Sequence, residues 1–260
     1  MSEPTLRRLR ARGAFALASR EIHRVAALWT QTLLPASLTG VLYLAVFGGA
    51  LGSRLGSVED LPYVAFILPG VVLMAVAVQS YGNASTSLFQ AKSEGYIEGV
   101  LMSPLRAWQI ALASLVGGLA RGWFAALAIT LAALPFGGRV TDPEIAILTI
   151  AITGFLFASL GVVVGISAES FDQQAFVSAL VIQPLALVGG IFYSARTLPE
   201  PWSTLTRLDP LYYLVDSARA GFTGFHESSL ALSLPLAAAV AAAIFGLATT
   251  LLARGWRLKP

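Results

Sequence analysis

Long apolar runs alternate with short polar stretches along most of the chain. Each run approaches the length of about 20 residues that a helix needs to cross the hydrocarbon core of a bilayer. The runs cover residues 32–51, 63–89, 107–134, 144–167, 175–193 and 230–253. The pattern therefore predicts an all-α integral membrane protein with six transmembrane helices.

Local signals in the polar stretches set the ends of several helices. Asp142 followed by Pro143 predicts an N-cap with proline in the first turn, and so does Asp209 followed by Pro210. Ser103 followed by Pro104 predicts a helix end, because the residue before proline disfavours the α region.

The first 30 residues form a separate cytoplasmic segment before the membrane domain of residues 31–260. Arginines alternate with apolar side chains, and from Phe15 onward the apolar residues recur at helical spacing. We expect an amphipathic helix that lies in the membrane interface. A basic tail that only sets the orientation of the spans is the alternative.

Composition supports the membrane assignment. The 260 residues are 56% hydrophobic and 12% charged, and the mean hydropathy is +0.74. Soluble domains average about 25% charged residues. The chain has no cysteine, which excludes disulfides and thiolate metal sites, and it has only two histidines, so we expect no metal centre.

The distribution of positive charge predicts that both termini are cytoplasmic. With six spans, eleven of the seventeen lysines and arginines then face the cytoplasm, as the positive-inside rule favours. These eleven are Arg7, Arg8, Arg10, Arg12, Arg20, Arg24, Lys92, Arg106, Arg254, Arg257 and Lys259. The outer loops hold five, which are Arg54, Arg139, Arg196, Arg207 and Arg219. Bases that flank spans indicate a membrane surface and not nucleic acid as the partner.

One charge, Arg121, falls deep inside a predicted span. An arginine there costs a few kcal/mol on insertion scales, so it either faces a polar pathway or is paired structurally. Gly118 and Gly122 form a GxxxG step on the same helix, which allows a close neighbour.

Amides form a second group of candidates. Gln79 and Asn83 share one face of the second span, and Gln183 lies in the fifth. Their functional interpretation is a polar lining for a substrate route, and the alternative is hydrogen bonding between helices.

The connector of residues 194–229 predicts two short helices at the outer membrane surface, with an ordinary surface loop as the alternative. Asp209 begins one of the helices, and Trp202 and Tyr212 have the amphipathic side chains of the membrane interface. Tyr193 stands at the end of the preceding span.

Three segments together resemble one known family. They are residues 21–56, residues 93–122 ("SEGYIEGVLMSPLRAWQIALASLVGGLARG") and residues 189–224 ("GGIFYSARTLPEPWSTLTRLDPLYYLVDSARAGFTG"). In this order they resemble the permease subunits of ABC-2 type, or type V, ABC exporters, such as those of Nod factor, daunorubicin-type drug and O-antigen polysaccharide export.

The resemblance implies an assembly in a bacterial inner membrane. Two copies of the permease would form a homodimer among membrane lipids and bind two cytoplasmic ATPase subunits, which would hold ATP and Mg. A coupling helix at about residues 89–103 would contact the ATPase through Glu94, Tyr96, Ile97 and Glu98. A re-entrant outer hairpin would join the fifth and sixth spans. The permease would export an amphiphile, such as a lipid-linked glycan, a glycolipid or a hydrophobic drug.

The residues themselves fit a chain without its own ATP site. No GxxxxGK[ST] phosphate loop occurs, and the only lysines are Lys92 and Lys259. An ATPase-independent secondary transporter or channel is the alternative, but no carboxylate pair lies inside a predicted span. A membrane-embedded hydrolase fits the two distant histidines poorly.

Overall fold

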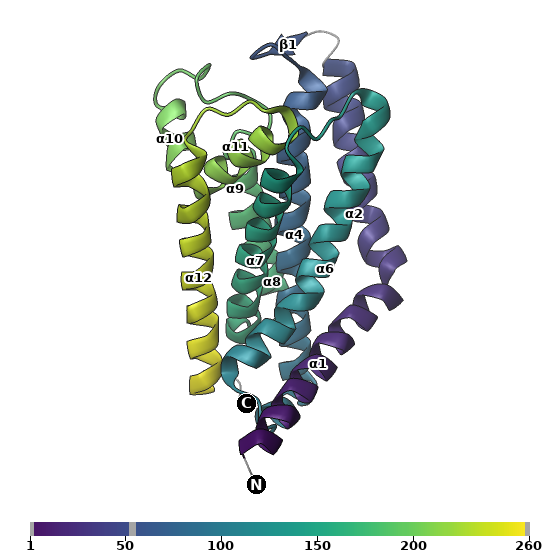
Figure 1. Ribbon diagram of the computed structural model, residues 1–260, viewed down its shortest axis with the longest axis vertical. Coiled ribbons are helices and arrows are strands. Elements are labelled where there is room, and N and C mark those ends of the chain that lie inside the picture. Colours follow the sequence, from purple (N-terminus) through teal and green to yellow (C-terminus); the bar gives the residue numbers. More distant parts are fainter. Residues whose placement is uncertain (1–2, 52–55, 258–260) are drawn as a thin grey trace.

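The computed structural model describes residues 3–51 and 56–257, without the side chains of residues 31–33, 36 and 48–51. It is a helical bundle, 80% helical, and Figure 1 shows its long helices side by side. The elements are α1 (Glu3–Ala27), α2 (Trp29–Tyr43), the π-helix η1 (Leu44–Leu51), β1 (Ser57–Val58), β2 (Leu61–Pro62), α4 (Tyr63–Ser93), α5 (Ile97–Leu101), α6 (Ala107–Ala133), the 3₁₀-helix η2 (Leu134–Phe136), α7 (Pro143–Ser167), α8 (Phe171–Val177), the π-helix η3 (Ser178–Ile182), α9 (Gln183–Val188), α10 (Trp202–Leu208), α11 (Pro210–Thr223) and α12 (Leu230–Arg254). The bases Arg54 and Lys259, used in the charge count, lie outside the described residues.

The all-α membrane fold is confirmed. Within the described residues, five helical segments are long and apolar enough to cross a bilayer. They are Tyr63–Ser93, Ala107–Phe136, Pro143–Ser167, Phe171–Val188 and Leu230–Arg254. The predicted first span corresponds instead to a shorter apolar helix, Ser37–Phe47, within the helical run of α2 and η1.

Helix α4 is the centre of the bundle, and α6 and α7 pack along it. Glycines allow this close approach: a Cβ on Gly118 would lie 2.6 Å from the Ser80 carbonyl oxygen. A Cβ on Gly161 of α7 would lie 2.6 Å from the Tyr81 carbonyl oxygen. The close neighbour predicted for the GxxxG step is therefore confirmed, and it is α4.

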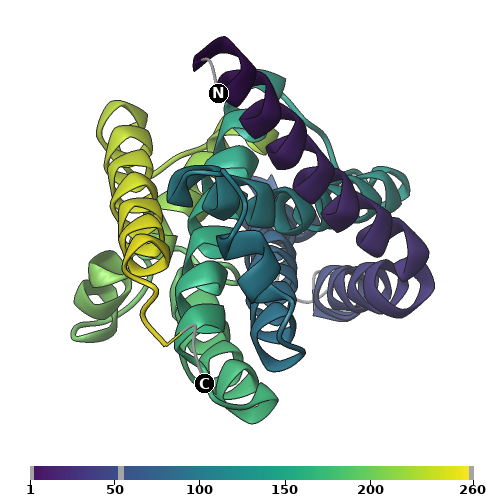
Figure 2. The ribbon, with the colours of Figure 1, turned by 90° about the horizontal axis from the view of Figure 1, so that it is seen from below.

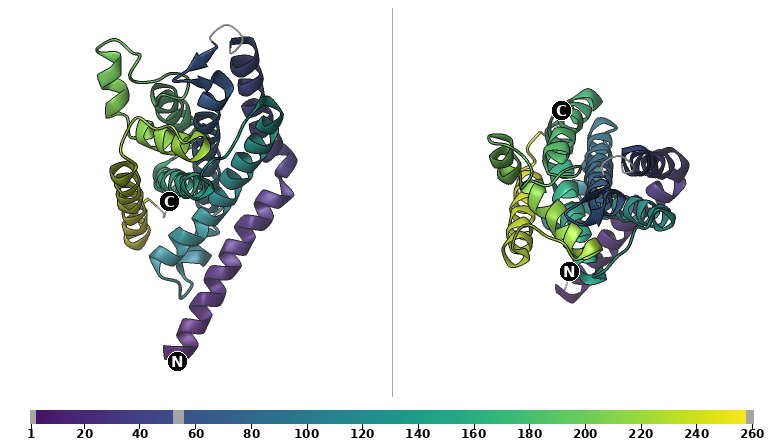
Figure 3. Two further views of the ribbon diagram at one scale, coloured as in Figure 1. Left: turned by 45° about the horizontal axis from the view of Figure 1, so that its top comes forward. Right: turned by 90° about the horizontal axis from the view of Figure 1, so that it is seen from above.

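The two ends of the bundle carry different elements. Helix α1 begins and α12 ends near the same end, which we call the terminal end (Figure 1). The turn between α4 and α6, which contains α5, lies there too, and the view from below shows α1 lying across this end (Figure 2). The β1–β2 hairpin, α10 and α11 lie at the opposite end, which we call the far end (Figure 3).

The predicted caps are confirmed. The Asp142 carboxylate accepts hydrogen bonds from the backbone N–H groups of Glu144 and Ile145, both at 3.2 Å. The Asp209 carboxylate accepts one from the N–H of Leu211 at 2.8 Å. Each cap is followed by proline in the first turn.

Helix α1 is present where an amphipathic helix was predicted. Phe15 and Ile22 are exposed, at 75% and 48%, while the other face packs against α6. Arg10 also donates a hydrogen bond from Nε to the Pro104 carbonyl oxygen, at 2.8 Å. The helix is therefore attached to the bundle and to the loop before α6.

Candidate functional site

A polar cluster joins α1, α4 and α6 in the half of the bundle nearer the terminal end. We call Glu21, Arg24, Asn83, Ser87 and Arg121 the arginine cluster. Glu21 is 1% exposed. Its carboxylate accepts hydrogen bonds from Arg24 Nη2 at 3.1 Å and from Ser87 Oγ at 2.8 Å. Arg20 forms a further ion pair with Glu21, at 2.9 Å.

Arg24 connects this ion pair to α4. Its Nη2 donates to the Asn83 carbonyl oxygen at 3.2 Å and to Asn83 Oδ1 at 3.1 Å. Gly117 of α6 leaves the space, because a Cβ there would lie 2.6 Å from Asn83 Nδ2 and 3.0 Å from Glu21 Cβ. The absence of a side chain on α6 thus lets a charged pair from α1 reach α4.

Arg121 is one turn further along α6. Its positive charge is near enough to that of Arg24 for the two to repel. Its Nε is buried and has no hydrogen-bond partner in the part of the chain that the structure describes. The sequence left open whether Arg121 lines a path or is paired structurally; among the described residues its Nε has no acceptor, and the nearby charge that acts on it is that of Arg24.

The three predicted amides lie in two places, and α4 contributes a residue to each. Asn83 belongs to the arginine cluster, whereas Gln79 and Gln183 line a cleft of about 310 Å³ between α2, α4 and α9. The Gln79 Oε1 atom is buried without a partner among the described residues. Since Gln79 and Asn83 are one turn apart on α4, the cluster and the cleft adjoin the same helix face.

The predicted coupling segment is built differently from one continuous helix over residues 89–103. Helix α4 continues to Ser93, the chain turns at Gly95 with a φ of +78°, and α5 follows as a five-residue helix. Glu94 and Glu98 therefore lie on either side of a turn. The helix end predicted before Pro104 is confirmed, because α5 ends at Leu101.

The four predicted contact residues of this segment differ in exposure. Glu94 and Glu98 are exposed, and Glu94 accepts a hydrogen bond from Gln90 Nε2 at 3.0 Å. Tyr96 is 37% exposed, and the Arg20 guanidinium lies 5.1 Å from its ring centre. Ile97 is 2% exposed and packs in the core, so its side chain offers no surface to a partner in this conformation.

The outer connector contains the two helices that the sequence predicted, α10 and α11. Tyr193 donates a hydrogen bond to the Val188 carbonyl oxygen at 2.6 Å. Trp202 begins α10 and is 60% exposed. Tyr212 donates to Glu227 Oε2 at 3.0 Å.

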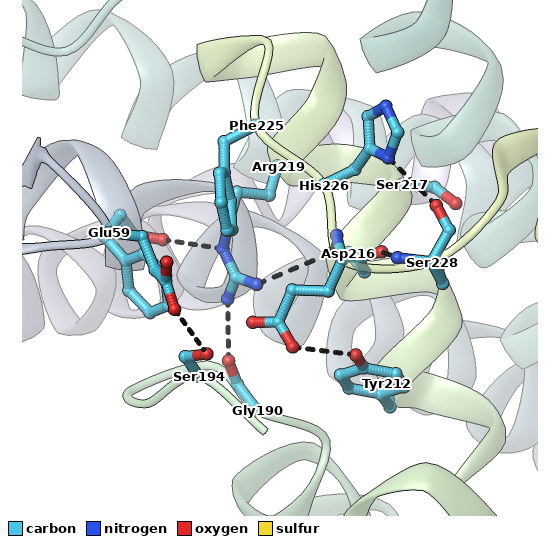
Figure 4. Close-up of polar contacts among 12 residues, drawn as sticks. Glu59, Gly190, Ser194, Tyr212, Asp216, Ser217, Arg219, Phe225, His226 and Ser228 are labelled. Atoms are coloured by element: carbon cyan, nitrogen blue, oxygen red, sulfur yellow. Dashed lines mark hydrogen bonds and ion pairs between the residues drawn. The ribbon is translucent and has the colours of Figure 1, made fainter. Parts of the chain in front are cut away.

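A buried charged pair fixes α11 to the bundle. Arg219 is 1% exposed and Asp216 is 0% exposed. Arg219 Nη2 donates to the Gly190 carbonyl oxygen at 2.7 Å (Figure 4), and its guanidinium lies 3.9 Å from the centre of the Phe66 ring. We call Arg219, Asp216 and their partners the outer junction.

Asp216 secures the chain that leads into α12. One carboxylate oxygen accepts from the Glu227 N–H at 2.8 Å, and the other accepts from the Ser228 N–H at 2.7 Å (Figure 4). Arg219 Nη1 lies 3.8 Å from Asp216, so this contact is electrostatic and longer than a hydrogen bond. The charge count placed Arg219 in the outer connector, and the structure has it in α11 of that connector with its side chain buried.

Sequence reasoning missed Glu21, Asp216 and Arg219. The i, i+3 spacing of Asp216 and Arg219 inside the otherwise apolar α11 was an available signal. Glu21 offered none, since it stands among arginines in a segment expected to face the interface. Within the described residues, no group of three His, Asp or Glu side chains could hold a metal ion.

Comparison with known proteins identifies the family. The family model of the ABC-2 type transporter matches residues 12–223. The chain is 34% identical over 244 residues to the inner membrane transport permease YadH of Escherichia coli (strain K12), covering 93% of this chain and 94% of that protein. It is 27% identical over 239 residues to nodulation protein J of Rhizobium meliloti (strain 1021), covering 89% and 90%. With a family match over most of its length and the apolar helices of a membrane transporter, this chain belongs to the ABC-2 type transporter family.

Proposed function

We propose that the chain is the permease subunit of an ATP-driven exporter that moves an amphiphile out of the cytoplasm or the inner leaflet. The family match over residues 12–223 carries this proposal. The name of YadH, an inner membrane transport permease, supports the inner membrane as the location. A separate ATPase would bind ATP and Mg and supply the energy.

The arrangement of bases supports a cytoplasmic terminal end. Helix α1 with its arginines, the turn that follows α4, and the end of α12 are at the same end of the bundle (Figure 1). Arg106 and Arg254 begin and end helices there. Positive charge concentrates on the cytoplasmic side of membrane proteins, so this end would face the ATPase.

The turn around α5 is the surface that we assign to the ATPase. Glu98 in the first turn of α5 is exposed, and Met102 is 85% exposed. Glu94 and Tyr96 border them. An exposed methionine beside carboxylates fits a docking surface better than a solvated turn, because Met is adaptable and apolar. The buried Ile97 side chain would hold α5 on the bundle.

A second copy of the chain would cover the cleft lined by Gln79 and Gln183. Leu38 of α2 is 55% exposed, and Leu180 and Leu187 of the fifth segment are 59% and 46% exposed. These apolar faces lie on two of the segments that border the cleft. Joining two such faces would enclose the amides between copies and give an amphiphile a partly polar route.

Copurification tests the proposal. The tagged chain is expressed with the ABC ATPase encoded beside it, purified in detergent, and reconstituted into vesicles for ATPase and transport assays. We expect the ATPase to copurify and transport to require ATP. Absence of a bound ATPase, together with transport that proceeds without ATP, would refute the proposal and favour a secondary transporter or channel.

Charge reversal tests the docking surface with a matched control. Glu98 and Glu144 are both exposed and both lie in the first turn of a helix, but at opposite ends of the bundle. The double variant Glu94→Lys/Glu98→Lys should reduce the copurified ATPase about tenfold or more, the effect of losing charged contacts at an interface. Glu144→Lys should leave it unchanged. Equal retention of the ATPase in both variants would remove the role assigned to α5.

A further inference from the structure

The arginine cluster has an excess of positive charge. Arg24 and Arg121 bring two positive charges, and Glu21 brings one negative charge, which Arg24 shares with Arg20, whose side chain is 45% exposed. Arg24 and Arg121 repel each other. A bundle at membrane depth screens charge poorly, so an uncompensated positive charge there is costly unless an anion joins it.

The cluster also has hydrogen-bond donors without acceptors. Arg24 Nε, Arg121 Nε and Asn83 Nδ2 are buried, and none has a partner among the described residues. They come from three different helices, α1, α6 and α4. A buried donor without an acceptor destabilises the folded state. The shared requirement of these atoms is a ligand that is rich in oxygen and negatively charged.

A surface cleft reaches two members of the cluster, Glu21 and Arg24. A cleft of about 660 Å³ lies beside α1, lined by Arg20, Glu21, His23, Arg24, Ala27 and Tyr96. Asn83 is about 15 Å from the end of α4 at Ser93, at 1.5 Å per residue. Arg121 is about 21 Å from the start of its span at Ala107, so the cluster lies within the membrane, and the Arg121 side chain leans toward the terminal end because helical side chains point toward the N-terminus of their helix.

We propose that Arg24, Arg121 and Asn83 form a binding site for the phosphate of an anionic lipid head group, which enters through the cleft beside α1. A phosphate monoester is an anion with three acceptor oxygens, so it compensates the excess positive charge and can accept from the three donors. Arginine binds phosphate in a planar, bidentate geometry. The site rests on the proposed function only in treating the bound lipid as cargo.

Lipid binding to the purified full chain tests the site without an ATPase. The chain is held in zwitterionic phosphatidylcholine nanodiscs, and phosphatidic acid, additional phosphatidylcholine or inorganic phosphate is added. Retained lipid is measured by native mass spectrometry and protection by the unfolding midpoint. We expect phosphatidic acid to bind and to raise the midpoint, and the other two to have no effect.

Two variants, each with one arginine replaced by glutamine, distinguish binding at the site from general attraction of the lipid to positive charge. Arg121→Gln should weaken phosphatidic acid binding about tenfold or more, as for the loss of a charged hydrogen bond. Arg12→Gln, an exposed residue of α1, makes the same charge change and should weaken it less than twofold. Arg121 is the test residue because Arg24 also holds Glu21, so its loss affects folding. Arg121→Lys, which keeps the charge but loses the fork, should give an intermediate affinity.

The outcomes are distinct. Equal weakening in Arg121→Gln and Arg12→Gln, or equal retention of phosphatidylcholine and phosphatidic acid, would overturn the site. Protection by inorganic phosphate equal to that by phosphatidic acid would overturn the lipid source. In the reconstituted complex, competition between phosphatidic acid and transport would identify the bound lipid as cargo. Transport that persists while the binding test fails would refute the site and leave the exporter proposal standing.

Discussion

Replacing Arg219 by methionine tests whether the outer junction holds the far end of the bundle together. At 3.8 Å from Asp216, the charge pair has a gross attraction of about 4 kcal/mol at an effective dielectric constant of 20. The substitution also removes the donor to the buried Gly190 carbonyl oxygen and the cation over Phe66. Methionine keeps much of the apolar volume. Because Asp216 stays buried and charged, we expect a loss of about 3–5 kcal/mol in the free energy of unfolding.

Reversible unfolding by SDS in mixed micelles measures this loss. Arg207→Met is the matched control, because Arg207 is an exposed arginine of the neighbouring α10. Its effect should remain within about 0.5 kcal/mol. The reasoning would be refuted if the losses for Arg219→Met and Arg207→Met differed by less than about 1 kcal/mol. It would also be refuted if a second change, Asp216→Asn, fully restored the stability of Arg219→Met, because that chain still lacks the Gly190 contact.

Three further predictions use the same unfolding assay. Gly161→Ala should lower the free energy of unfolding by about 1–3 kcal/mol, because its Cβ would lie 2.6 Å from the Tyr81 carbonyl oxygen. The control Gly246→Ala has open space around the new Cβ and should not destabilise the fold. Equal effects of the two changes would contradict the close packing of α4 and α7. Lys92→Met should cost about 1.5–3 kcal/mol, because Lys92 Nζ donates to the carbonyl oxygens of Ile166, at 2.9 Å, and Ala168; an unchanged midpoint would show that water replaces it. Burial raises the pKa of Asp209 from 3.8 to about 6, so the folded state retains a proton that the unfolded chain loses, and stability should fall as the pH rises from about 4 to 6 and then level off. Asp209→Asn keeps a cap and should remove that slope, and a persisting slope would assign it to another group.

What could be predicted from the sequence was local. The caps at Asp142 and Asp209 depend on a side chain and an N–H group two or three residues away, so the dipeptides with proline were sufficient. The ends of α4, α7 and α12 follow from apolar runs bounded by polar residues. The π-helical turns η1 and η3 were not predictable, since nothing in the apolar pattern distinguishes them from α-helix.

What the sequence could not provide was which distant residues meet. Glu21 looked like one more charge on a basic, surface-lying helix, and its burial depends on α1 approaching α4 beside Gly117 of α6. Arg219 looked like a loop base for the same reason: its burial arises from Phe66 and Gly190, which are far away in sequence. Composition alone assigns such a charged residue to the surface, and only its tertiary neighbours show that it is buried.

The outer junction and the arginine cluster differ in how completely their arginines are paired, which suits the first to anchoring and the second to binding. Both hold α4 to another helix through an arginine, Arg219 from α11 and Arg24 from α1. In the outer junction Arg219 is fully engaged by two carbonyl oxygens, a ring and a carboxylate, so a ligand could only displace existing contacts. In the arginine cluster Arg24 and Arg121 each keep a buried N–H without an acceptor among the described residues, and their charges repel. An anion there would accept from these N–H groups and relieve the repulsion, so an added anion should stabilise the α1 side of the bundle and leave the outer junction unaffected.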